Sequence, residues 1–218
     1  MRERTLADGL AEGSRGLGLE LAESQTRLLL RYADLIARWG RVYNLTALRE
    51  PNELLTHHLL DSLAAVPPLR RQTGGAAVRV LDAGSGAGLP GLVFAIVCPE
   101  LDVTCVDTVG KKAAFIQQAA AELDLRNVQA RHARVERLAG SPFDVIASRA
   151  FASLADFTAL TRHALAPGGV WMALKARDVE REAAALDADI EMFHVEPLRV
   201  PGLDAERCIA WLRRRPLA

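Results

Sequence analysis

The chain has 218 residues, 50% of them apolar and 25% charged, and its formal net charge at pH 7 is +0. A chain of this length forms one domain, or one domain with a small appendage, and buries about 70% of the surface that it exposes when unfolded. No apolar run approaches the ~20 residues that cross a bilayer, and no apolar segment follows the charged first residues. We therefore expect a cytoplasmic protein that makes no membrane contact.

The neutral charge balance argues against bulk attraction to nucleic acid, although it leaves room for a local basic patch. The cysteines are odd in number, scattered and set in apolar surroundings. This pattern favours reduced thiols packed in the core over a disulfide framework or a zinc site. The three residues are Cys98, Cys105 and Cys208.

The N-terminal third of the chain reads as helical. Residues 1–18 carry four glycines and little periodicity, so we expect a loosely ordered entry. Residues 20–39 place apolar side chains at helical spacing, which predicts an amphipathic helix that ends at Gly40. A second helix is expected to open near Pro51 and to be closed by the prolines at 67 and 68.

Two histidines and a carboxylate share this second helix. Asp61 follows His57 by four residues and His58 by three, so the three side chains lie on neighbouring positions of a helical surface. Two imidazoles with one carboxylate are a weak metal signal. We favour packing or a hydrogen-bonded pair, and we predict no metal site.

The most informative stretch is residues 80–91, in which an apolar strand ends in Asp82 and is followed by closely spaced glycines. Glycine takes positive φ at little cost and lets a ligand lie against the backbone. A helix that starts near Pro90 would direct free amide groups toward that ligand. The pattern predicts a strand, a tight ligand-binding turn and a helix, although a turn without a ligand is the simpler alternative.

Two cofactors compete for this loop. The spacing of Gly86, Gly88 and Gly91 satisfies the G-x-G-x-x-G fingerprint of dinucleotide binding, with Asp107 where a ribose-binding acid would fall. The overlapping D-x-G-x-G-x-G, which starts at Asp82, resembles the cofactor loop of class I methyltransferases, which bind S-adenosylmethionine.

The rest of the chain favours the second cofactor. Strands at 101–107, 127–132, 143–149 and 170–175 alternate with helices at 92–97, 110–123, 154–165 and 177–186. This alternation predicts a mainly parallel sheet with helices on both faces. Two final strands, 194–200 and 207–212, are joined by a short turn and must pair antiparallel. An antiparallel hairpin that ends a parallel sheet, and a Pro-Gly-Gly turn such as that at 167–169, are typical of class I methyltransferases.

Several separated motifs make the resemblance more specific. From Trp39 to Trp211 the chain resembles the bacterial small-subunit ribosomal RNA guanine-N7 methyltransferases, also called glucose-inhibited division protein B. The family usually has glycine after the Leu-Lys of the fifth strand, where this chain has Ala176. The motifs that carry the resemblance are Trp39 with residues 43–46, His58 with residues 60–62, residues 82–91, Asp107 with Lys111 and Lys112, residues 134–136 and residues 148–154.

The resemblance implies a class I methyltransferase fold, with an N-terminal helical extension over residues 1–70 and a methyltransferase domain over residues 71–218. It also implies that Gly84 and Leu89 line the S-adenosylmethionine site, that Val135 and Glu136 hold the adenine end, and that Arg149 reaches the cofactor.

Residue chemistry extends this set of cofactor-binding residues. Asp82 and Gly86 belong to the same loop, and Asp107 at a strand end can accept hydrogen bonds from ribose hydroxyls. Arg149 follows an apolar strand, where an unpaired guanidinium would be costly, so we expect a carboxylate partner from the cofactor or from the protein.

The implied reaction is methyl transfer to guanine N7 in 16S ribosomal RNA or the small ribosomal subunit. Guanine N7 carries no proton, so we expect no general base and no catalytic nucleophile. The target base must be unstacked, with Phe151, Trp39 and Tyr43 as candidates for stacking. The basic residues expected to contact phosphate are Lys111, Lys112, Lys175 and Arg199.

Two alternatives stay open at the sequence level. One is a methyltransferase of the same fold that acts on a small molecule or a protein. The other is a non-catalytic RNA-binding assembly factor. No obligate protein partner is evident from the sequence.

Overall fold

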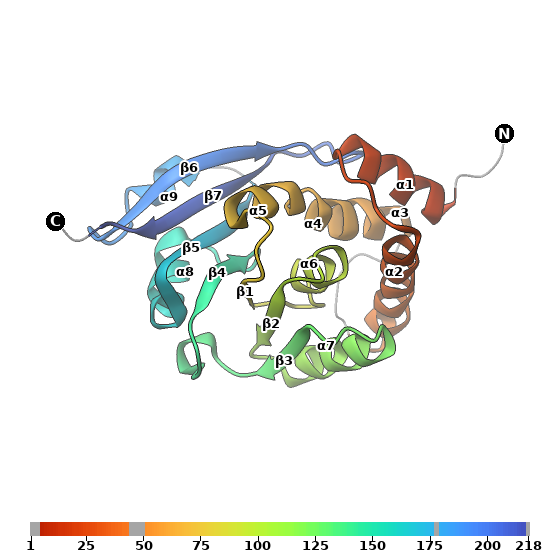
Figure 1. The fold of residues 1–218 in the computed structure, drawn as a ribbon, viewed down its shortest axis with the longest axis horizontal. Coiled ribbons are helices and arrows are strands. Elements are labelled where there is room, and N and C mark those ends of the chain that lie inside the picture. The colour runs from red at the N-terminus through yellow and green to blue at the C-terminus, as the bar shows by residue number, and fades with distance from the viewer. Residues whose placement is uncertain (1–4, 44–50, 177–178, 217–218) are drawn as a thin grey trace.

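A seven-stranded sheet forms the centre of the computed structural model, which describes residues 5–43, 51–176 and 179–216 (Figure 1). The strand order is β3-β2-β1-β4-β5-β7-β6, and β7 is antiparallel to both of its neighbours. The predicted closing hairpin is therefore confirmed. The strands are β1 (Arg79–Ala83), β2 (Asp102–Asp107), β3 (Val128–His132), β4 (Phe143–Ser148), β5 (Leu165–Lys175), β6 (Ile190–Leu198) and β7 (Arg207–Arg214).

Helices cover both faces of the sheet. They are α1 (Leu6–Gly16), α2 (Glu23–Tyr43), α3 (Pro51–Leu54), a π-helix (Leu55–Leu60), α4 (Asp61–Leu63), α5 (Val66–Thr73), α6 (Gly91–Val97), α7 (Gly110–Glu122), α8 (Leu154–Thr161) and α9 (Val179–Ala183), with short 3-10 turns at Val135–Arg137 and Arg162–Ala164. No helix among the described residues is long and apolar enough to span a membrane.

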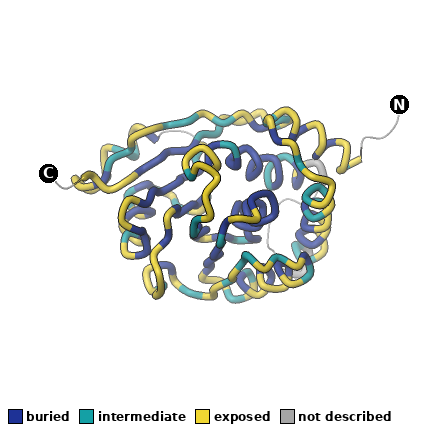
Figure 2. Tube along the Cα trace, viewed as in Figure 1, coloured by how far each residue is buried: buried dark blue, intermediate teal, exposed yellow. Residues whose placement is uncertain are grey.

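Side-chain alternation divides the core into two clusters. Val80 and Met172 pack with α2 and the helices from the π-helix to α7, whereas their neighbours Leu81 and Trp171 pack with α8 and α9 on the opposite face. Successive residues of a strand point to opposite faces, and both faces of this sheet are covered, so its central strands are buried along most of their length (Figure 2).

The N-terminal entry is more regular than the sequence suggested. The expectation of a loosely ordered entry is wrong, because Thr5 and Asp8 form a capping box that starts α1. The Thr5 Oγ1 accepts a hydrogen bond from the Asp8 amide at 3.1 Å, and the Asp8 carboxylate accepts one from the Thr5 amide at 3.1 Å. Leu10 anchors the helix in the core, and Gly13 lets α1 approach Leu60 closely.

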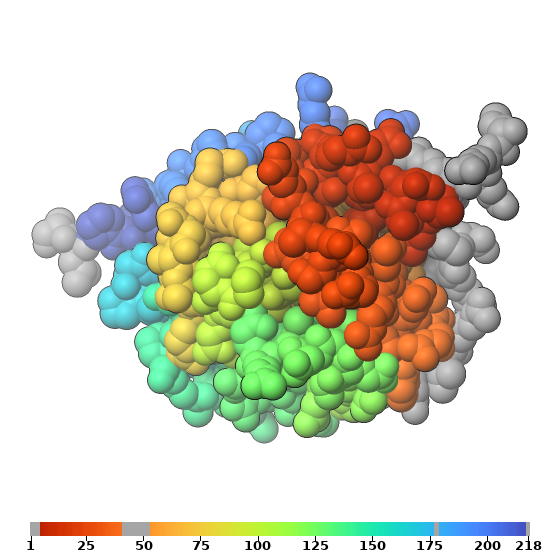
Figure 3. All heavy atoms as spheres, turned by 45° about the vertical axis from the view of Figure 1, so that its right-hand side comes forward, coloured from red at the N-terminus to blue at the C-terminus, as the bar shows by residue number. Residues whose placement is uncertain are grey.

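Two predicted helix ends are also wrong. The α2 helix continues past Gly40 because Trp39 packs on Phe115 of α7, with ring centroids 6.3 Å apart, and tertiary packing outweighs the low helix propensity of glycine. Pro67 and Pro68 do not close a helix; they lie in the first turn of α5, where a missing amide hydrogen costs nothing. In Figure 3, α2 packs against both α1 (red) and α7 (green). Residues 44–46 lie outside the described part of the chain.

The later elements match the predictions in type, with shorter helices. The α8 helix ends at Thr161 instead of residue 165, and α9 spans only Val179–Ala183. The Pro-Gly-Gly segment at 167–169 lies within the irregular start of β5, where the pairing with β4 shifts register.

Candidate cofactor and substrate site

The glycine loop lies between β1 and α6, at the carboxyl ends of the parallel strands. Gly84 has φ of +72°, and a Cβ there would lie 2.7 Å from the Cβ of Ala150, so the loop packs directly on the segment after β4. Gly86 has φ of +60°, but a Cβ there would meet no atom within 4 Å. Gly84 is thus needed for packing, whereas Gly86 faces open space beside the loop.

Asp82 holds the start of α6 from inside the core. Its Oδ2 accepts a hydrogen bond from the Gly91 amide at 2.9 Å, and a Cβ on Gly91 would collide with Cys105 Sγ at 2.5 Å. Burial raises the pKa of Asp82 to about 6, against the opposing effects of the Gly91 hydrogen bond and the Arg149 charge. The other oxygen, Oδ1, is buried without a hydrogen-bond partner. A hydrogen-bond donor on a bound ligand would satisfy this oxygen.

Asp107, at the end of β2, links that strand to the glycine loop. Its Oδ2 accepts from the Gly86 amide at 2.9 Å and its Oδ1 from the Val109 amide at 2.8 Å. Each carboxylate oxygen has two lone pairs, so both oxygens can accept one more hydrogen bond. Asp107 therefore has the capacity for two ligand hydroxyls.

A cavity of about 290 Å³ opens beside Asp107. Four of the eight predicted cofactor-binding residues line it, together with Phe151, which was predicted to contact the substrate base. Two larger hollows among the described residues, of about 850 and 470 Å³, contain no residue of the glycine loop. The cavity is lined by Gly84, Val106, Asp107, Thr108, Ala133, Arg134, Val135, Glu136, Phe151 and Leu160.

Hydrogen bonds stabilise the charged form of Glu136. A hydrogen bond from its own backbone amide and then one from Arg134, at 3.1 Å, lower the pKa of this carboxyl. Val135 beside it is buried, so this turn gives the cavity an apolar wall with a charged acceptor at its rim.

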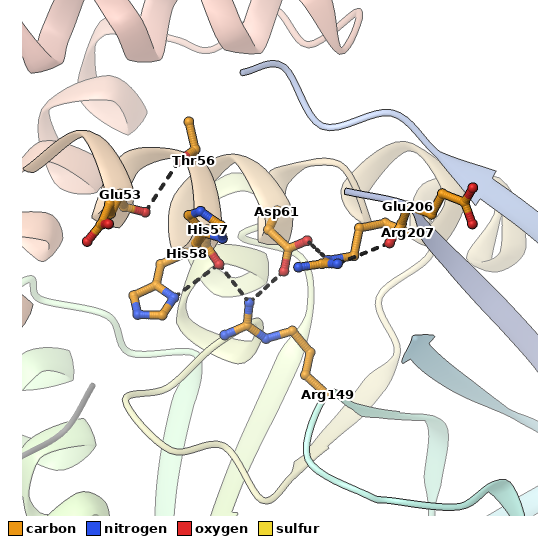
Figure 4. Close-up of polar contacts among 8 residues, drawn as sticks. All are labelled: Glu53, Thr56, His57, His58, Asp61, Arg149, Glu206 and Arg207. Atoms are coloured by element: carbon orange, nitrogen blue, oxygen red, sulfur yellow. Dashed lines mark hydrogen bonds and ion pairs between the residues drawn. The ribbon is translucent and has the colours of Figure 1, made fainter. Parts of the chain in front are cut away.

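Arg149 has the carboxylate partner that its position required, and this partner is Asp61 of α4 (Figure 4). The Arg149 Nη1 lies 2.7 Å from Asp61 Oδ2, and the Arg207 Nε lies 3.0 Å from Asp61 Oδ1. The Asp61 side chain is only 8% exposed. One buried carboxylate thus joins the N-terminal helices, the segment after β4 and the start of β7.

The two histidines beside this cluster are linked through the main chain of His57. His58 Nδ1 lies 3.1 Å from the carbonyl oxygen of His57, which also accepts a 3.4 Å hydrogen bond from Arg149. Burial, followed by the positive charge of Arg149, lowers the pKa of His58 to about 4. The ring is therefore neutral at physiological pH.

Sequence reasoning named Arg149 but missed the roles of Asp61 and Arg207. Asp61 was singled out by its helical spacing from His57 and His58 and by a motif of the resemblance, but neither signal pointed to an arginine partner. Arg207 is one of many arginines, and nothing in its local sequence distinguishes it.

All four predicted phosphate contacts lie at the expected edge of the sheet, but only three of them are placed to reach solvent. Lys111 and Lys112 are in the first turn of α7, directly after β2. Arg199 is exposed and follows β6, which runs parallel to β5 because both pair antiparallel with β7. Lys175 is different, because its side chain is only 13% exposed and its Nζ lies 2.8 Å from Glu182 Oε1.

The other aromatic candidates and Leu89 take separate places. Trp39 packs on Phe115, and the side chain of Tyr43 lies outside the described residues. Leu89 is buried in the core cluster next to α6 and does not line the cavity. Phe151 packs on Phe157, with ring centroids 5.2 Å apart, so its ring forms a fixed wall.

The strand order and the glycine loop define a class I S-adenosylmethionine-dependent methyltransferase, and solved structures share this fold. A 1,6-didemethyltoxoflavin N1-methyltransferase from Burkholderia thailandensis, crystallised with S-adenosylhomocysteine, superposes with a TM-score of 0.58 at 17% identity, covering 90% of this chain and 92% of that chain. TrmN from Thermus thermophilus gives a TM-score of 0.56 at 21% identity, covering 73% of this chain and 53% of that one.

Sequence comparison identifies the family. The family model of GidB, the rRNA small subunit methyltransferase G, matches residues 25–210. A protein named ribosomal RNA small subunit methyltransferase G from Methylibium petroleiphilum is 62% identical over 97% of this chain and 96% of its own length. The protein of the same name from Acidovorax ebreus is also 62% identical, over 96% of both chains. The chain belongs to the rRNA small subunit methyltransferase G family, and it is an S-adenosylmethionine-dependent rRNA methyltransferase.

Proposed function

We propose that this protein transfers the methyl group of S-adenosylmethionine to N7 of a guanine in 16S ribosomal RNA. The observation that carries the proposal is the cavity beside Asp107, which joins the glycine loop to the segment after β4 in a chain of this family. Its relatives are named for the small-subunit RNA.

The residues present fit S-adenosylmethionine. Open space beside Gly86 leaves room for a ligand against the backbone, and the orphaned Oδ1 of Asp82 calls for a donor such as the cofactor's ammonium group. The two oxygens of Asp107 would accept the ribose hydroxyls. Val135 would pack on the adenine ring and Glu136 would accept from its amino group. Leu89 and Arg149 do not line the cavity, and they would contact the cofactor at the other end of the glycine loop.

Methyl transfer to guanine N7 requires the protein mainly to position the base and the cofactor. When bound, the cofactor supplies an electrophilic methyl group on a positively charged sulfur. Guanine N7 has a lone pair in the plane of the ring and no proton to remove, so no side chain has to act as a base. The residues around the cavity have to hold the base in line with that methyl group and exclude water. Phe151 would separate the cofactor from the base and stack on one of them.

Phosphate contacts would come from the exposed basic residues at the same edge. Lys111, Lys112 and Arg199 are placed to contact the RNA backbone around an unstacked nucleotide. The chain is neutral as a whole, so this attraction has to be local.

The substrate assignment is tested in ribosomal RNA from cells with and without the gene. Borohydride reduction followed by aniline cleaves RNA at N7-methylguanine. We expect one cleavage in 16S RNA that disappears when the gene is deleted and returns when it is restored. An unchanged pattern would contradict the proposal.

Two further measurements separate the alternatives. Calorimetry that finds NAD binding without S-adenosylmethionine binding would overturn the cofactor assignment. A small-molecule or protein methyltransferase predicts turnover without RNA. A non-catalytic assembly factor predicts that Arg149→Ala or Gly84→Asp leaves the biological function intact.

A further inference from the structure

We propose that Lys175 and Glu182 form a clamp that fixes the segment between β4 and α8, and that Lys175 positions this wall of the cofactor cavity instead of contacting RNA. The proposal rests on the methyl transfer proposed above, and it replaces the phosphate role predicted for Lys175.

The ammonium group of Lys175 has all of its donors in use. It lies 2.8 Å from Glu182 Oε1, 3.2 Å from the carbonyl oxygen of Phe151 and 3.1 Å from that of Ala152. An ammonium group has three hydrogens to donate, and here there are three acceptors. A phosphate could be contacted only if one of these hydrogen bonds were broken.

Glu182 extends the clamp to the next helix. Its Oε2 accepts a 2.8 Å hydrogen bond from the amide of Leu154, the first residue of α8. The first amides of a helix have no partner within the helix, so this contact satisfies one of them. The pair therefore holds two successive carbonyls of the segment and the start of the helix that follows it.

The clamped segment forms part of the cofactor cavity. Ala150 lies against Gly84 of the glycine loop, and its amide donates to Ser148 Oγ at 3.0 Å. Phe151 lines the cavity itself. A shift of this segment would therefore change the shape of the cavity and the distance to the glycine loop.

Little room remains between the segment and the end of β5. The void bounded by Phe151, Leu154 and Lys175 has a volume of about 10 Å³. This is about the space of one water molecule, so neither a base nor a phosphate fits there.

The test compares Lys175→Met with two controls. Arg162→Met breaks an ion pair with Asp189, in which neither residue lines the cavity. Arg199→Met removes an exposed charge at the predicted RNA surface. Affinity for S-adenosylhomocysteine is measured by calorimetry without RNA, and RNA binding is measured as a function of salt concentration.

We expect Lys175→Met to weaken S-adenosylhomocysteine binding by about tenfold and to leave the salt dependence of RNA binding unchanged. Arg162→Met should change neither quantity. Arg199→Met should leave cofactor affinity intact and reduce the magnitude of the slope of log K against log salt by about 0.7 to 0.9.

Two more variants keep the proposal falsifiable. Lys175→Arg preserves the charge, which suits a phosphate contact, but a planar guanidinium does not fit three converging acceptors. The clamp predicts that this variant stays impaired in cofactor binding. Glu182→Gln keeps an acceptor for the Leu154 amide and loses only the charge, and it serves if Lys175→Met does not fold.

Three results would contradict the proposal that Lys175 and Glu182 form a clamp. They are wild-type behaviour of Lys175→Arg, a reduced salt slope with unchanged cofactor affinity in Lys175→Met, and unchanged cofactor affinity in Glu182→Gln. Since cofactor affinity is measured without RNA, a wrong RNA substrate would leave the affinity results for Lys175→Arg and Glu182→Gln unaffected and would appear in the cleavage mapping.

Discussion

Asp61 accepts hydrogen bonds from two arginines that lie 88 and 146 residues away in the sequence. The carboxylate is buried, so neutralising it leaves two partly buried guanidinium groups without their counter-charge. The residue is therefore central to both stability and the position of Arg149.

Replacing Asp61 with asparagine keeps the shape and removes the charge. We expect Asp61→Asn to lower the free energy of unfolding by about 3–5 kcal/mol, measured by urea denaturation. The matched control is Asp189→Asn, which breaks an exposed pair with Arg162 and should cost less than about 1 kcal/mol. Similar losses in the two variants would contradict the role of the buried cluster.

His58 gives the same region a dependence on pH. Its pKa falls from about 6.5 when unfolded to about 4 when folded, so the unfolded chain binds the proton more readily. Its contribution to stability is present above pH 6.5 and is lost as the pH falls toward 4. Asp82, with a pKa raised to about 6, acts in the opposite direction, because its ionisation destabilises the folded state as the pH rises from 3.8 to 6.

A difference measurement isolates the histidine. We expect wild-type protein to lose more stability than His58→Gln between pH 7 and pH 4.5, because glutamine gains no proton. Urea denaturation of both proteins at the two pH values measures this, and the contribution of Asp82 cancels in the comparison. Equal losses would show that His58 is not held neutral by the fold.

At the scale of elements, two glycines of the loop between β1 and α6 differ in their surroundings. Gly84 touches Ala150, whereas Gly86 borders open space. Both have positive φ, so alanine at either position costs about 1–2 kcal/mol in backbone strain. Only Gly84→Ala adds a collision within the fold.

We therefore expect the two alanine variants to differ in stability and in ligand affinity. Gly86→Ala should stay folded with a small loss of melting temperature, and it should bind S-adenosylhomocysteine poorly, because its methyl group enters the ligand's space. Gly84→Ala should lose more stability. Thermal melting and calorimetry measure the two effects, and normal ligand affinity in Gly86→Ala would place the cofactor elsewhere.

The sequence predicted elements whose signals are local. The glycine loop, the parallel strands and the closing hairpin all followed from spacing and turn residues. The α1 helix was missed for two reasons. Its capping box has Asp8 in the place where Glu or Gln is usual, and three of its residues are glycines, which favour helices poorly. The pairing of Asp61 with Arg207, and of Lys175 with main-chain carbonyls, joins segments far apart in the sequence, so no local pattern announces it.

At the scale of the whole molecule, the N-terminal extension and the methyltransferase domain share one core. Leu10, Leu29 and Leu59 belong to the same buried cluster as Phe94 and Ile116. We propose that the predicted boundary at residue 70 separates regions of different function within a single folding unit.

This proposal predicts the behaviour of the shortened chain. Residues 71–218 alone would expose the apolar surfaces of α6 and α7 to water, so we expect this fragment to aggregate or to lack a cooperative transition in urea. The full chain should unfold in one transition followed by both near-UV and far-UV circular dichroism. A fragment that unfolds cooperatively would show that the extension is a separate domain.

The π-helix at Leu55–Leu60 determines which side of the helical segment Asp61 occupies. In an uninterrupted α-helix, Asp61 would lie on the same face as Leu54, seven residues earlier, which is buried in the apolar core. The wider turns rotate the residues after Leu60 by about one position, or roughly 100°. This offset lets one continuous helical segment present leucine to the core and a carboxylate to two arginines. Deleting one residue of the π-helix should therefore keep that carboxylate facing both arginines, because six steps of an ordinary α-helix turn by the same angle as the seven steps that include the wider turns.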